Sequence, residues 1–208
     1  MPRQPDPDVE GRILQAADAL WKKGGEKSLT MRAVARVAKT NTPALYRRFK
    51  DREDLIRALL LRIVERLRSH LERGNTLEEM AEAYVEFAMR MPHEYELFYT
   101  HGRVLSPKKG AKPKAIRESR PNFALVEQLL AQQLGGRPED HTQRALALWA
   151  LMHGTTTLLL SQSIPEGHEE ELRVACRSAV RSLLGDAAGK RFNNQAKANA
   201  GVHEHRQA

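Results

Sequence analysis

Helical periodicity is the feature that most constrains the fold of this chain. Apolar residues recur every three or four positions through most of the 208 residues, and no long stretch alternates between apolar and polar positions as a half-buried strand would. Glycine and proline interrupt the pattern at intervals, and polar residues that can cap helices precede several segments. The sequence therefore predicts an all-α protein of about nine helices: three short ones, a connector and a larger bundle.

Several of the expected helices have recognisable ends. Gly24-Gly25 ends the first, and Thr30 and Asn41 are suitable N-caps for two short helices that follow. Thr76 and Glu79 form the pattern of a capping box. Two later helices start near Pro121 and Pro138, where a missing N–H is tolerated. A last helix spans about 166–184, and its expected inward residues are Leu172, Ala175, Ala179, Val180 and Leu183.

The helix expected over 51–73 is apolar on more than one face, as a connector packed on two sides would be. Its apolar residues are Leu55, Ile56, Leu59, Leu60, Ile63, Val64, Leu67 and Leu71. Further on, residues 106–114 are basic and contain Pro and Gly, which predicts a mobile loop. Apolar residues become scarce after Gly185, so we expect a disordered tail over 186–208.

Positive charge is concentrated near the N-terminus. The chain has 34 Lys+Arg and 26 Asp+Glu, a formal charge of +8, but residues 1–50 hold 11 and 5 of these, a balance of +6. Such a distribution is typical of a domain that binds a polyanion, although basic side chains that merely solvate a helix surface would give the same balance.

Residues 29–50 contain two short helices separated by about three residues, which is the spacing of a helix-turn-helix. In this motif the second helix enters the major groove and the first crosses the DNA backbone. Val34, Ala35, Ala38, Leu45 and Phe49 are the expected core. The residues left to divide between the groove and the phosphates are Thr42, Pro43, Ala44, Tyr46, Arg47 and Arg48.

The sequence here resembles the TetR (tetracycline repressor) family of transcriptional regulators. The resemblance is carried by the first amphipathic helix, the T-x-R-x-V-A-x-x-A run and L-Y-R-R-F-K-D-R-E-D-L, across residues 10–60. It implies phosphate contacts from Thr30, Arg32, Tyr46 and Lys50, and groove contacts from Thr42, Pro43, Ala44 and Arg47. Asn41 and Lys39 complete the predicted DNA-binding set. Pro43 and Ala44 cannot hydrogen-bond to bases, so thymine methyl groups are expected partners.

Lys39 is the one departure from the family pattern in this segment, because the family usually has glycine in the turn. A glycine there permits a positive φ, which a lysine adopts only at an energetic cost. Lys39 also places one more positive charge near the DNA.

The C-terminal half contains Trp149-Ala-Leu-Met-His153-Gly154, which is similar to the W-x-x-x-H-G signature of one family branch. The family resemblance implies an inducer pocket within the bundle and a homodimer formed by the last two helices. It also implies a pseudo-palindromic operator. Gly154 would allow another helix to approach closely. The candidate ligand-binding residues are Ile63, Leu67, Tyr84, Phe87, Met91, Phe98, Phe123, Trp149, Met152 and His153. The same residues would serve equally as core or dimer packing, and few inward charges favour an apolar or aromatic ligand.

Other classes of function find little support. No metalloprotease, phosphate-loop or nucleophile-elbow motif is present, so we expect no enzyme activity, no cofactor and no metal site. No segment is apolar enough to span a membrane, no signal peptide is recognisable, and Cys176 is the single cysteine, which favours a cytoplasmic protein. The alternative, a helical small-molecule-binding or interaction protein without DNA binding, leaves the basic bias unexplained. The expected organisation is a DNA-binding domain at 1–50, a ligand-binding and dimerisation domain at 51–185, and the tail.

Overall fold

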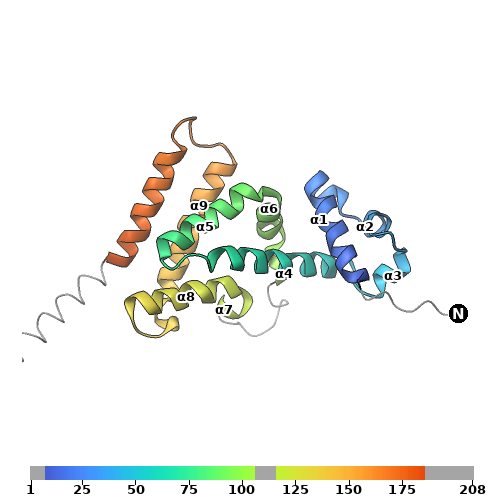
Figure 1. Ribbon diagram of the computed structural model, residues 1–208, viewed down its shortest axis with the longest axis horizontal. Helices are drawn as coiled ribbons and strands as arrows, with labels where there is room; N and C mark the ends of the chain where they lie inside the picture. The colour runs from blue at the N-terminus through green and yellow to red at the C-terminus, as the bar shows by residue number, and fades with distance from the viewer. Residues whose placement is uncertain (1–7, 106–115, 186–208) are drawn as a thin grey trace, which may run out of the picture. The chain divides into compact units, whose positions relative to one another are not determined.

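The computed structural model describes residues 8–105 and 116–185, and these residues are almost entirely helical (Figure 1). They form ten α-helices and two short 3-10 helices, without a strand, which confirms the all-α class. The helix beyond the expected nine is the four-residue α7 (Ile116–Ser119), which is too short for periodicity to reveal. The predicted loop at 106–114 and tail at 186–208 lie outside the described residues. None of the helices in the described ranges combines the length and apolarity of a membrane span.

The chain divides into two compact units. The first consists of Met1–Ser69 and Arg90–Arg120, and the second of His70–Met89 and Pro121–Ala208. The N-terminal helices and most of α4 (Arg52–Leu71) therefore belong to the first unit, together with α6 (Pro92–His101), the 3-10 helix η1 (Gly102–Leu105) and α7.

The first unit begins with a three-helix head, formed by α1 (Val9–Ser28), α2 (Met31–Val37) and α3 (Thr42–Tyr46). Helix α2 packs on α1, and α3 packs on α2. Regular helical geometry in α1 breaks at the expected place, since Gly24 and Gly25 leave the helical region and Gly25 has a φ of 57°. The buried apolar residues of α1 are Ile13, Leu14, Ala16, Ala17 and Trp21.

Helix α4 is buried on more than one side, as its sequence predicts. All eight of its expected apolar residues are at most 6% exposed. Asp51 starts the helix, because its Oδ1 accepts the Asp54 N–H at 2.8 Å. A carboxylate at this end is also favoured by the helix dipole.

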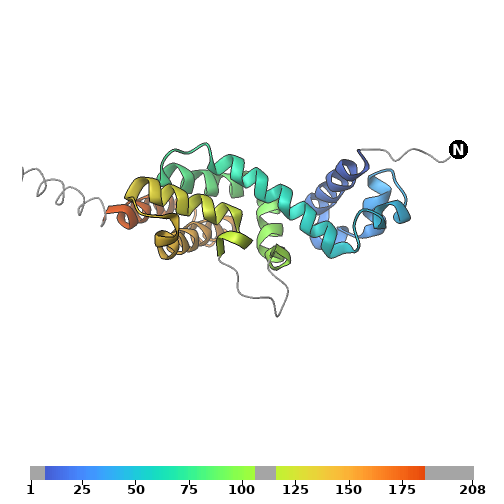
Figure 2. The same cartoon turned by 90° about the horizontal axis from the view of Figure 1, so that it is seen from below.

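The second unit contains α5 (Leu77–Arg90, up to Met89), α8 (Pro121–Leu134), the 3-10 helix η2 (Pro138–His141) and α9 (Thr142–Leu160), followed by a helix over 169–185. Helices α8 and α9 lie side by side, as Figure 2 also shows. The predicted capping box of α5 is present: Thr76 Oγ1 accepts the Glu79 N–H at 3.2 Å, and Glu79 Oε2 accepts the Thr76 N–H at 3.3 Å.

The last helix is rotated relative to the sequence prediction. Cys176 and Val180 are buried, whereas Ala175, expected inward, is exposed. The reason is electrostatic as well as apolar: Arg173 and Arg177 both form ion pairs with Glu82 of α5, which turns this edge of the helix toward α5. Apolar side chains are consequently left exposed on the opposite side, and Val174 is 48% exposed.

Candidate nucleic-acid interface

Local capping and a small core hold the two helices of the candidate helix-turn-helix. Thr30 Oγ1 accepts the Ala33 N–H at 3.2 Å at the start of α2, and Asn41 Oδ1 accepts the Ala44 N–H at 2.8 Å at the start of α3. Both capping predictions are confirmed. The five expected core residues are at most 4% exposed: Val34, Ala35, Ala38, Leu45 and Phe49. The framework therefore forms without using the polar side chains that face outward.

Lys39 lies in the turn between α2 and α3, where the family pattern has glycine, and it adopts a left-handed backbone conformation. Its φ is 52°. The Thr40 N–H donates to Ala35 O at 3.0 Å and the Lys39 N–H donates to Arg36 O at 3.2 Å, the bond pattern of a Schellman motif. Glycine is the usual residue at this position because it has no Cβ to clash, so the lysine is held there against its preference.

Arg52, at the start of α4, fixes the segment between α1 and α2. Its Nε donates to Leu29 O at 2.8 Å, and its Nη2 donates to Glu26 O at 3.2 Å and to Glu26 Oε1 at 3.2 Å. One planar guanidinium thus satisfies two backbone carbonyls and a carboxylate, a geometry that lysine cannot reproduce. The head is attached to the first turn of α4 by these bonds.

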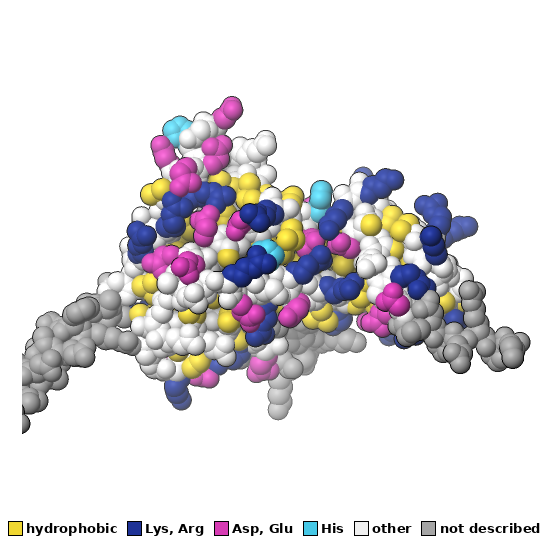
Figure 3. All heavy atoms as spheres, in the orientation of Figure 1, with side chains coloured by type: hydrophobic (Ala, Val, Ile, Leu, Met, Phe, Trp, Pro, Cys, Tyr) yellow, Lys and Arg dark blue, Asp and Glu magenta, His cyan; other side chains and the backbone are white. Residues whose placement is uncertain are grey.

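The outward side of α2 and α3 is strongly basic. From Thr30 to Lys50 the sequence has six Lys+Arg and no Asp+Glu, and all six basic side chains are exposed: Arg32, Arg36, Lys39, Arg47, Arg48 and Lys50. Lys and Arg gather around the head on the face shown in Figure 3. With low-dielectric helices behind them and no acidic side chain among them, these cations create a positive potential suited to phosphates.

The predicted DNA-contacting residues are brought together on this short segment. Tyr46 is 50% exposed, so it is not a core aromatic residue. Thr42 and Ala44 are half-buried, and Pro43 in the first turn of α3 is exposed. The remaining members are all exposed: Thr30, Arg32, Lys39, Asn41, Arg47 and Lys50. Asn41 retains its two amide N–H donors after capping, and Tyr46 presents a phenolic O–H.

The predicted ligand-binding residues are divided between the two units. Ile63, Leu67, Met91 and Phe98 belong to the first, and Tyr84, Phe87, Phe123, Trp149, Met152 and His153 to the second. In the second unit the rings of Phe123 and Trp149 lie edge to face, 6.2 Å apart. His153 is half-buried, and burial holds the pKa of its imidazole below the usual value.

Gly154 lies on a part of α9 that the described residues leave uncovered. A Cβ added there would meet no heavy atom within 4 Å, so no helix among the described residues approaches it closely. Leu158, one turn later on α9, is also 38% exposed. The expected close approach of another helix at Gly154 therefore stays a prediction, which a helix from outside the single chain would have to fulfil.

Two residues that attach the head to the neighbouring helices, Arg52 and Glu94, were not predicted from the sequence. Arg52 lies in a segment that resembles the family, but its bonds to the α1–α2 connection cannot be recognised from spacing. Glu94 of α6 is 1% exposed and pairs with cations of α1 and α4. A lone glutamate in an aromatic segment carries no local signal for such burial.

Comparison with known proteins identifies the family. The model of "Bacterial regulatory proteins, tetR family" matches residues 13–59, and that of "Tetracyclin repressor-like, C-terminal domain" matches residues 77–183. The chain belongs to the TetR family. The first match covers the head and the start of α4, and the second covers more than half of the chain. Both parts of the chain therefore match the TetR family of transcriptional regulators.

Individual relatives agree with this placement. An uncharacterized HTH-type transcriptional regulator of Mycobacterium tuberculosis is 29% identical over 153 residues, which are 70% of this chain and 67% of that protein. A solved structure of a protein of unknown function from Rhodococcus sp. RHA1 is 25% identical, covers 88% of this chain and 100% of its own, and has a TM-score of 0.68. The multidrug binding protein EbrR complexed with imidazole is 22% identical, covers 86% and 96%, and shares the fold with a TM-score of 0.63.

Proposed function

We propose that this TetR-family chain is a ligand-responsive repressor that binds a pseudo-palindromic DNA operator as a homodimer and is released by a small-molecule inducer. The observation that carries the proposal is the outward side of α2 and α3, where six cations and no acid accompany the exposed Tyr46, Pro43 and Asn41. A helix-turn-helix places such side chains between the groove and the phosphates.

The roles within this surface follow from chemistry. Cations and the Tyr46 hydroxyl would contact phosphates, which positions the protein without reading sequence. Thr42, Pro43, Ala44 and Arg47 at α3 would face the base edges. An arginine can donate two bonds to guanine, and the methyl-bearing or apolar groups suit thymine methyls. Thr42 and Ala44 are short and half-buried, whereas Arg47 is exposed, so Arg47 has the longest reach toward the base edges.

The test is DNA binding by the full chain as a function of salt, with Tyr46→Phe, Tyr46→Ala, Thr42→Val and Arg47→Ala. Tyr46→Ala should weaken binding to every duplex alike, and Tyr46→Phe isolates the hydroxyl. Thr42→Val and Arg47→Ala should change the preferred sequence obtained by selection from a random duplex library. Binding by the wild-type chain that does not depend on salt would refute DNA recognition.

The proposed dimer interface is formed by the last two helices, α9 and residues 169–185. Three large apolar side chains on them are unusually exposed in the single chain: Leu146 at 37%, Leu158 at 38% and Val174 at 48%. Apolar side chains gathered on one pair of helices favour association, and two copies related by a two-fold axis would cover them. The open space at Gly154 supports the same placement, because a partner helix could approach there.

Gly154→Leu tests this interface. Within one chain a Cβ at position 154 meets no heavy atom within 4 Å, and leucine is a better helix former than glycine, so the monomer should fold at least as well. If a partner helix packs on Gly154, the leucine should raise the dimer dissociation constant by about tenfold or more. Sedimentation equilibrium is the measurement, with Gln128→Leu on α8 as a matched surface control. An unchanged dimer would place the interface elsewhere.

For the effector, the second unit offers an aromatic pair beside a histidine whose neutral form is favoured. Phe123 and Trp149 lie edge to face, Met152 is 4% exposed, and His153 has a lowered pKa. This chemistry supports an apolar or aromatic ligand. A thermal-shift screen of apolar and aromatic small molecules should find binders that release bound DNA, and Trp149→Ala should weaken them. Binders unaffected by Trp149→Ala would exclude this location.

A further inference from the structure

The first turn of α6 contains a buried charged residue, Glu94, which is 1% exposed. One carboxylate oxygen, Oε1, is 3.1 Å from Lys22 Nζ of α1 and 3.0 Å from Arg66 Nη1 of α4. The other oxygen, Oε2, has no hydrogen-bond partner among the described residues. A buried carboxylate is costly unless it is paired, so these two cations and the N-terminal dipole of α6 offset the cost of burying Glu94.

The same two cations also contact Asp18 of α1. Lys22 Nζ is 2.9 Å from Asp18 Oδ2, and Arg66 Nη2 is 3.7 Å from Asp18 Oδ1. Two acids and two bases from three helices thus form one group, the Glu94 cluster (Asp18, Lys22, Arg66 and Glu94). Alongside it, Trp21 Nε1 donates to His93 O at 2.7 Å. Helix α1, the first helix of the head, is therefore attached to α6 at neighbouring side chains on one of its faces.

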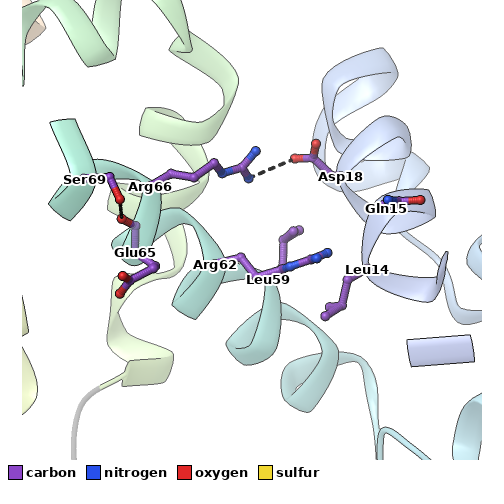
Figure 4. A pocket seen from close by; sticks show the side chains of 8 residues that line it. All are labelled: Leu14, Gln15, Asp18, Leu59, Arg62, Glu65, Arg66 and Ser69. Carbon is purple, nitrogen blue, oxygen red and sulfur yellow. Dashed lines mark hydrogen bonds and ion pairs between the residues drawn. The ribbon is translucent and has the colours of Figure 1, made fainter. Parts of the chain in front are cut away.

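A crevice adjoins the cluster between α1 and α4 (Figure 4). It has a volume of about 450 Å³ and is lined by Leu14, Gln15, Asp18, Leu59, Arg62, Glu65, Arg66 and Ser69. Figure 4 shows Arg66 extending from α4 across the gap to Asp18. The crevice leaves space between α1 and α4 on this side, and the ion pair between Arg66 and Asp18 spans that space.

We propose that Glu94 is a positioning residue for DNA recognition, which sets the orientation of α1, and with it of α2 and α3, through Lys22 and Arg66. The inference rests on the proposed function, since it requires that α2 and α3 bind DNA. Arg52 holds the far end of α1 through Glu26, so the Glu94 cluster supplies the second attachment that prevents α1 from turning about the first.

Replacing Glu94 by glutamine separates charge from shape. Glutamine keeps the volume and one acceptor oxygen but removes the negative charge shared by Lys22 and Arg66, leaving Asp18 as the only acid of the cluster. The head should then sample several orientations on α6. Contacts of a single head with phosphates tolerate this, whereas recognition of two half-sites at a fixed separation does not.

The experiment compares wild type with Glu94→Gln, Glu94→Asp and Glu96→Gln as full chains. Glu96 lies on the same helix but its side chain is exposed, so Glu96→Gln is the matched control. The probes are a duplex enriched by the wild-type chain from a random library and a shuffled duplex of the same composition. Circular dichroism confirms folding. Lys22→Met is the second variant, to be used if Glu94→Gln does not fold, because the Lys22 side chain is 45% exposed and its replacement disturbs the fold less.

We expect Glu94→Gln to lose about tenfold in affinity for the enriched duplex, within the usual range of coupling between sites, and less than twofold for the shuffled duplex. Lys22→Met should change selectivity in the same direction, Glu94→Asp should retain part of it, and Glu96→Gln should change neither affinity. A purely structural role would lower both affinities together, and that result, or unchanged selectivity in the folded variants, would overturn the proposal. A wild-type chain that binds no duplex would instead refute the proposed function itself.

Discussion

Lys39 allows a quantitative test of the α2–α3 turn. Its φ of 52° lies in the left-handed region, which costs a residue with a Cβ about 1–2 kcal/mol. Lys39→Gly removes this cost but gives the unfolded chain more conformational freedom, worth about 0.5–1 kcal/mol in the opposite direction. The Schellman bonds made by Lys39 and Thr40 use backbone atoms only and are retained. The net expectation is a stabilisation of about 0.5–1 kcal/mol.

The assay is urea unfolding followed by circular dichroism, with a thermal melt beside it. For a chain of this size the change corresponds to an increase of about 1–4 °C in Tm. Lys39→Ala is the matched control, because it also removes the charge but retains the left-handed penalty. A Lys39→Gly protein no more stable than Lys39→Ala would refute the argument from backbone conformation.

The same pair of variants tests the charge of Lys39. Both remove one cation from each head, so both should reduce the slope of log affinity against log salt by about 0.9 per head if Lys39 neutralises a phosphate. Equal reductions would assign the effect to charge, and a reduction in Lys39→Gly alone would assign it to the altered turn.

Three further predictions concern capping and titration. Asn41→Ala removes the acceptor of the Ala44 N–H and should cost about 1 kcal/mol in urea unfolding; equal stability would show that solvent replaces the cap. Thr76→Ala and Glu79→Ala each break the α5 capping box, so the double variant should lose less than the sum of the single losses, and strict additivity would contradict a shared motif. Burial lowers the pKa of His153 below its ordinary value of 6.5, so the unfolded chain takes up the proton first and stability falls as pH decreases through about 6.5. His153→Asn should flatten this part of the pH profile of the urea midpoint, and an unaltered profile would contradict the assignment.

Local rules explain why the head could be predicted so fully from sequence. The caps at Thr30 and Asn41, the Gly24-Gly25 break and the buried Leu45 and Phe49 each depend on residues within a few positions of one another. The turn at Lys39 was recognisable because a family pattern marks where glycine is expected. The predicted DNA-contacting residues remain predictions, but their outward placement is compatible with every role assigned to them.

Long-range charge pairs account for most of what sequence did not predict. The burial of Glu94 depends on Lys22 and Arg66, which are distant in sequence and lie on two other helices. The rotation of the last helix likewise depends on Glu82, far earlier in the chain, which draws Arg173 and Arg177 toward it. Helical periodicity identifies which residues are apolar, but it does not identify which carboxylates will find a cation.

The two arginines of α4 that hold the head have a mechanical consequence. Arg52 and Arg66 lie fourteen residues apart on one helix, a distance of about 21 Å at the rise of an α-helix. The two attachments together fix the angle between α1 and α4, whereas either one alone would let α1 turn about it. On α1 the corresponding contacts, at Asp18 and Glu26, lie eight residues apart, which is about 12 Å at the same rise. A displacement of about 1 Å at the Asp18 contact would therefore turn α1 by about 5° about the Glu26 contact. Because α2 packs on α1 and α3 packs on α2, the DNA-facing helix would turn with it.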